Sequence, residues 1–67
     1  MARLMPDQVQ KVRAALERIA RSDLVDKFGY EPTPYICGVV KRVLARDHDE
    51  RSQEALAIVR EYEQDSE

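Results

Sequence analysis

Cysteine and glycine are scarce in this sequence, and each scarcity excludes a kind of site. The 67 residues include one cysteine and two glycines. One cysteine cannot form a disulfide within the chain, and a lone thiol suits a reducing compartment better than secretion. Cys37 and His48 are too few for the four ligands that structural zinc sites usually use. Because Gly29 and Gly38 stand alone, there is no glycine-rich phosphate loop. We therefore predict no cofactor and no metal.

Long apolar segments are also lacking. No apolar run approaches the roughly 18 residues that a membrane span needs. The first eight residues, MARLMPDQ, lack the apolar core of a signal peptide. We expect a cytoplasmic protein with no membrane partner.

The length predicts one domain over residues 1–67, with little room for a core. A domain of this size buries only about 60% of the surface that its unfolded chain exposes. Hydrophobic residues make up 43% of the chain and charged residues 36%, which is enough apolar material for a folded domain. With disulfides and metals excluded, self-association is the remaining way to supplement the core. We expect a homodimer.

Helical periodicity predicts an all-α fold, a small bundle of three to four short helices. Pro6 suits the first position of a helix over 5–21, and Leu4 with Val9 has the spacing of a hydrophobic staple. The next helices are expected at 22–28, capped by Ser22 or Asp23, and at 34–46, capped by Thr33. An acidic C-terminal helix follows over about 48–64, with a frayed tail at 65–67.

The junction between the last two helices admits two interpretations. Asp47 and Glu50 have the spacing of a capping box, which favours a break near residues 46–51. No glycine or proline lies there, so the two helices would also be able to fuse into one.

The third predicted helix is unusually apolar. Its apolar residues spread over about 200° of the helical wheel, roughly twice the width needed to pack against one neighbour. They are Tyr35, Ile36, Cys37, Val39, Val40, Val43 and Leu44. Only a narrow strip of Gly38, Lys41, Arg42 and Ala45 is expected to face outward. This helix is therefore either central in the bundle or shared between its own core and a partner.

Charge divides the chain in two. Residues 1–46 hold nine Lys or Arg and five Asp or Glu, whereas residues 47–67 hold two and eight. A basic body with an acidic tail is compatible with nucleic-acid binding, and equally with attraction between the two parts, within one chain or between two.

Catalysis has little support in the sequence. The only nucleophile and base of note, Cys37 and His48, do not form a recognisable constellation, and a small buried cysteine is the more ordinary interpretation. The run Asp47 to Glu50 offers metal ligands, but adjacent residues of a helix diverge by about 100°. We expect no enzymatic activity and no catalytic, cofactor-binding or metal site.

Residues 23–46, DLVDKFGYEPTPYICGVVKRVLAR, resemble a helix-turn-helix. Leu24, Val25 and Phe28 occupy the apolar positions of that motif and Gly29 its turn, provided that the turn is one residue longer than usual. The resemblance implies a dimeric DNA-binding regulator of transcription. Its nucleic-acid contacts would come from Thr33, Lys41, Arg42 and Arg46.

Protein binding accounts for more of the sequence. Tyrosine is enriched at interfaces, and Tyr30 and Tyr35 bracket a turn stiffened by prolines. Gly38 in mid-helix leaves a shallow track beside Lys41 and Arg42. We predict a non-enzymatic regulator or inhibitor that occupies an acidic surface of a protein partner through these five residues. The alternative interpretation is structural: the tyrosines cap the core, and Gly38 makes room for the first helix.

Overall fold

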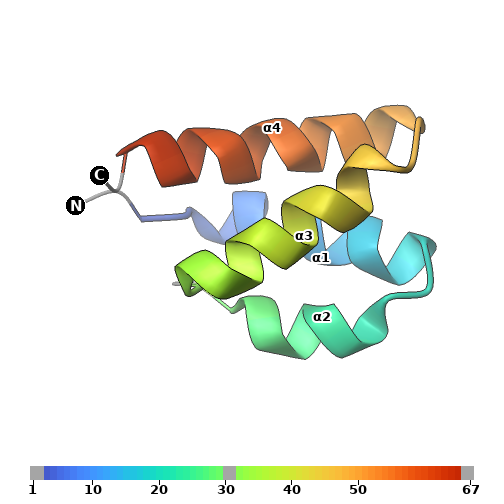
Figure 1. Ribbon diagram of the computed structural model, residues 1–67, viewed down its shortest axis with the longest axis horizontal. Coiled ribbons are helices and arrows are strands. Elements are labelled where there is room, and N and C mark those ends of the chain that lie inside the picture. Colours follow the sequence, from blue (N-terminus) through green and yellow to red (C-terminus); the bar gives the residue numbers. More distant parts are fainter. Residues whose placement is uncertain (1–2, 30–31, 66–67) are drawn as a thin grey trace.

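Four helices make up the part of the chain described by a computed structural model, residues 3–29 and 32–65. They are α1 (Pro6–Arg18), α2 (Ser22–Phe28), α3 (Pro34–Ala45) and α4 (Glu50–Asp65). Successive helices run in opposite directions, so α1 begins and α4 ends on the same side of the molecule (Figure 1). No strand occurs in these residues, and the predicted all-α bundle is confirmed.

The core lies between all four helices. α4 packs along both α1 and α3, and α2 packs against α1 and α3 on the other side (Figure 1). Burying one large apolar side chain contributes roughly 1.5–3 kcal/mol to folding. The largest fully buried side chains come from every helix: Phe28, Leu16, Leu44, Val12, Val40 and Val59. No helix of the described residues is long and apolar enough to cross a membrane.

The start of α1 follows the prediction, but its end does not. Pro6 is its first residue, and Leu4 and Val9 are both buried. The helix ends at Arg18, before the predicted residue 21, because the chain reverses at Ala20, whose φ is 62°. Glycine usually fills such a left-handed position, so the sequence carried no sign of this reversal.

The caps of α2 and α3 differ. α2 begins at Ser22 after Arg21, and no side chain caps it, so the predicted cap at Ser22 or Asp23 is wrong. α3 has the predicted cap: Thr33 Oγ1 accepts a hydrogen bond from the Ile36 N–H at 3.2 Å. Pro34 follows as the first helical residue. The entry into α3 is therefore fixed by local chemistry.

A break separates α3 from α4, as the capping signal favoured, but the capping residue is Asp49 rather than Asp47. The Asp49 carboxylate accepts the Arg51 N–H at 2.8 Å. Asp47 instead accepts a hydrogen bond from the fully buried Ser52 hydroxyl at 2.6 Å and pairs with Arg18 of α1. The hydrogen bond from Ser52 is the main cause that lowers the pKa of Asp47. These contacts tie the α3–α4 turn to the end of α1.

Candidate interaction surface on α3

One side of α3 points away from the bundle and carries an exposed tyrosine. The Tyr35 side chain is 77% exposed, the highest value among the large hydrophobic residues of the described chain. Arg42 lies seven residues later, two helical turns along, so it shares that side. We call this surface the α3 face and define it as Tyr35, Gly38, Val39, Arg42 and Arg46.

The wide apolar arc of α3 is divided between the core and a half-buried margin. Cys37, Val40 and Leu44 are buried. Ile36, Val39 and Val43 are partly buried and pack against the core from its edge. The helical wheel predicted Tyr35 to lie in the same apolar arc, but its side chain is exposed to solvent. The structural alternative, in which Tyr35 caps the core, does not fit this exposure.

Gly38 is a notch in the α3 face. A Cβ atom built at this position would meet no heavy atom within 4 Å. The alternative in which Gly38 makes room for α1 is therefore wrong, because nothing from another helix approaches it. Glycine in mid-helix costs about 1 kcal/mol relative to alanine. Packing within this chain does not account for that cost.

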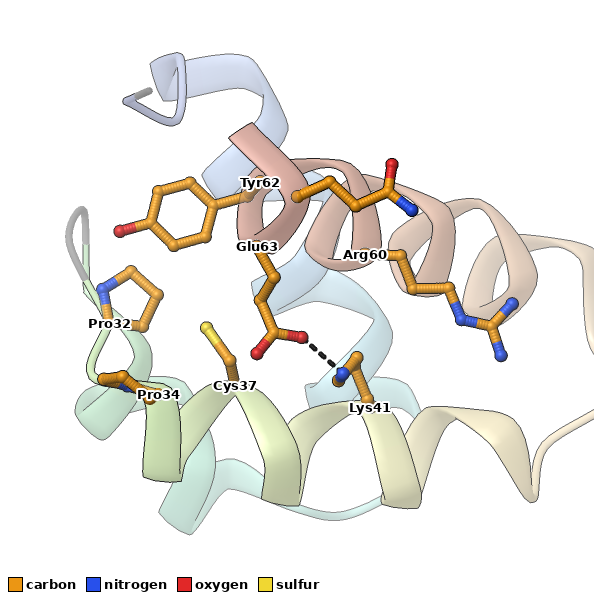
Figure 2. A pocket seen from close by; sticks show the side chains of 8 residues that line it. Pro32, Pro34, Cys37, Lys41, Arg60, Tyr62 and Glu63 are labelled. Carbon is orange, nitrogen blue, oxygen red and sulfur yellow. Dashed lines mark ion pairs between the residues drawn. The ribbon is translucent and has the colours of Figure 1, made fainter. Parts of the chain in front are cut away.

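Lys41 was expected to face outward, but it turns toward α4. Its ammonium group forms an ion pair with Glu63, which Figure 2 shows across the gap between α3 and α4. The pair lies in a cleft of about 750 Å³ that is also lined by Pro32, Pro34, Cys37 and Tyr62. Lys41 is therefore part of the α3–α4 contact rather than of the α3 face.

The acidic end of the chain pairs with its basic body. Lys11 of α1 contacts Glu54 at 2.7 Å, Arg18 pairs with Asp47 and Asp49, and Lys41 pairs with Glu63. Such exposed pairs contribute little stability each, but they compensate much of the charge division within one molecule.

Two arginines of the α3 face remain uncompensated. Arg42 and Arg46 are exposed, and neither forms an ion pair with another described residue. α3 itself contains no carboxylate. The α3 face thus combines an aromatic ring with positive charge.

Cys37 shows no sign of activation. It is buried, and this burial is the main cause that raises the pKa of its thiol, so the reactive thiolate is disfavoured. His48 is exposed in the α3–α4 turn. Among residues 3–29 and 32–65, no group of three or more His, Cys, Asp or Glu side chains is placed to hold a metal ion.

The predicted site residues that the structure describes therefore separate into three groups. Tyr35, Gly38 and Arg42 share the α3 face, together with Arg46 from the DNA-binding prediction. Lys41 lies in the cleft, and Thr33 caps α3 with its hydroxyl oxygen. Tyr30 falls outside the described residues. Glu63, which pairs with Lys41, was missed because it lies 22 residues further along and no local pattern links the two.

Comparisons with protein-family models, curated proteins and solved structures each found no match.

Proposed function

We propose that this chain is a small non-enzymatic protein-binding module that regulates or inhibits a protein partner by occupying its surface with the α3 face. The observation that carries the proposal is the 77% exposed Tyr35 ring on the same side as the unpaired Arg42. Tyrosine and arginine are the residue types that, with tryptophan, most often dominate binding energy at interfaces.

The charge of the α3 face defines the partner. Arg42 and Arg46 have no carboxylate to pair with on α3, so a complementary surface carries Asp or Glu. Tyr35 supplies a large contact area at low entropic cost because its side chain has few rotatable bonds. Gly38 allows the partner backbone to come close to α3. The partner is therefore an acidic protein surface with an apolar patch for the ring.

Site-specific photocrosslinking tests this proposal. A photoreactive phenylalanine analogue in place of Tyr35 is expected to capture a partner protein in host cells, whereas the same analogue in place of Met5 is not. Met5 is a matched control because, among residues 3–29 and 32–65, it is the other exposed large hydrophobic residue, at 60%. The captured protein should no longer bind the Arg42→Glu variant but should still bind the Arg51→Glu variant. Arg51 is the control because it is an exposed arginine on α4. Equal capture from both positions, or equal effects of both reversals, would show that the α3 face is not the binding surface.

DNA binding by a dimeric helix-turn-helix regulator is the second candidate, favoured by the uncompensated Arg42 and Arg46 near the C-terminal end of α3. The turn of this motif would be residues 29–33, which separate α2 from α3. These five residues are more than the usual three or four. Phosphate contacts through these arginines would make binding strongly salt-dependent. A fluorescence-anisotropy titration with mixed-sequence duplex at low salt tests it. No change in anisotropy removes this candidate, while a change lost in Arg42→Glu and kept in Arg51→Glu supports it.

A further inference from the structure

Four of the five residues of the α3 face form two pairs about one point of the helix, Tyr35 with Arg42 and Gly38 with Val39. Tyr35 and Arg42 each lie three and a half residues from the midpoint between Gly38 and Val39. At 1.5 Å per residue, each side chain starts about 5 Å along the axis from that midpoint, in opposite directions. A two-fold axis through the midpoint therefore places Tyr35 of one chain level with Arg42 of another.

We infer that the α3 face also binds a second copy of this chain, as an antiparallel α3–α3 pair that crosses at Gly38 and Val39. The surface is the one used in the proposed function, but the inference needs no foreign partner. A two-fold interface places the same patch on both chains, so each contact occurs twice. The patch must then be complementary to itself: Tyr35 and Arg42 meet that condition by facing each other, and the two Arg46 side chains, about 22 Å apart along the axis, lie outside the contact.

The attraction in this pair comes from a cation and an aromatic ring. A guanidinium over a tyrosine ring is attracted by the negative face of the ring. The Tyr35 ring is exposed, and Arg42 has no ion pair in the described chain that would have to be broken. The two Arg42 side chains of the pair lie about 10 Å apart along the axis, and each is covered by the ring of the other chain.

The notch at Gly38 sets the crossing point. Helix axes usually pack 8–10 Å apart, and smaller side chains at the contact allow the shorter distances. Nothing lies within 4 Å of the Gly38 Cβ position, so the second backbone has room to approach. Val39, beside it, is only partly buried and becomes covered in the pair.

Self-association on this surface has a regulatory consequence. The same three residues, Tyr35, Gly38 and Arg42, cannot contact a second copy and a foreign partner at once. The homodimer therefore withholds the α3 face, and dimer dissociation must precede partner binding.

Opposite charges at position 35 distinguish a second copy from an acidic partner. In Tyr35→Glu, the new carboxylate meets Arg42 of the second copy, so the dimer persists and becomes salt-sensitive. In Tyr35→Lys, two cations meet at each contact, and the dissociation constant should rise more than about tenfold. An acidic partner gives the reverse order, tolerating Lys and rejecting Glu. Sedimentation equilibrium measures the dimer, with Met5→Glu and Met5→Lys as matched controls.

Cysteine crosslinking tests the antiparallel arrangement in a Cys37→Ala background. Val39→Cys lies beside the axis, leaves the Gly38 notch open and should oxidise to a covalent dimer, because a disulfide needs Cα atoms within about 7 Å. Ala45→Cys, exposed near the end of α3, should not, since two copies of residue 45 lie about 20 Å apart along an antiparallel pair.

Four results overturn the inference: a species of only 7.8 kDa at millimolar concentration, a dimer unaffected by Tyr35→Lys, a dimer that Val39→Cys does not crosslink, or equal crosslinking at positions 39 and 45. A foreign partner captured at Tyr35 alongside a strictly monomeric chain would refute the dimer and leave the proposed function standing.

Discussion

Replacing Gly38 with alanine should stabilise the fold and weaken the binding of a second copy of the chain. Glycine in mid-helix costs about 1 kcal/mol relative to alanine, and the new methyl group would meet nothing within 4 Å. The free energy of unfolding should therefore rise by the full amount, about 1 kcal/mol. For a domain of this size it corresponds to a rise of about 4–8 °C in the melting temperature. The same methyl group stands where the second chain approaches, so dimer affinity should fall.

Urea denaturation followed by circular dichroism at 222 nm measures the stability change. A Tyr35→Lys background weakens the dimer in both proteins, so that dimer affinity has less effect on the result. Gly29→Ala is the matched control. Its φ of 60° and ψ of −162° lie in a region open essentially to glycine alone, so it should destabilise by about 1–3 kcal/mol. Equal or lower stability of Gly38→Ala would refute the reasoning, because it would mean that the Cβ position is not open.

Three further predictions concern the fold that presents the α3 face. Thr33→Ala should lower the free energy of unfolding, measured by urea denaturation, by about 1 kcal/mol because it removes the α3 cap. Thr33→Ser keeps a capping hydroxyl and should keep most of that stability. Leu44→Ala should cost about 2–5 kcal/mol and leave much of the chain unfolded by circular dichroism, whereas exposed Ala45→Ser should not. Because the pKa of Asp47 is lowered in the fold, its carboxylate contributes fully to the free energy of unfolding above the ordinary pKa of 3.8. This contribution is lost as the pH falls through the lowered pKa. The stability difference between wild type and Asp47→Asn should therefore shrink from pH 7 to pH 2; a constant difference would contradict this assignment.

Local signals in the sequence predicted the helices well where a helix end uses ordinary chemistry. Thr33 and Pro34 at the start of α3 are an example, because a side-chain oxygen followed by proline acts within one turn. The end of α1 was mispredicted because an alanine takes the left-handed position. The role of Asp47 was mispredicted because one of its partners, Arg18, lies 29 residues away and meets it only through tertiary packing.

The candidate surface was only partly predictable for the same reason. The spacing of Tyr35, Gly38 and Arg42 identified one side of α3, since helical geometry follows from sequence. It did not reveal that Tyr35 would be exposed, nor that Lys41 would be drawn to α4. Both depend on where α4 lies, and the pairing of Lys41 with Glu63 forms only when the two helices meet.

A dilution series by heteronuclear NMR tests the α3 face most directly, because it reads each amide without any substitution. As the uniformly ¹⁵N-labelled protein is diluted from millimolar to micromolar concentration, we predict that the amide signals of Tyr35, Gly38, Val39 and Arg42 shift together along one binding curve. The amides of Met5 and Lys27 should stay in place. Shifts confined to the outer side of α4, or no shift anywhere, would contradict the assignment of the α3 face as an interaction surface between copies of this chain.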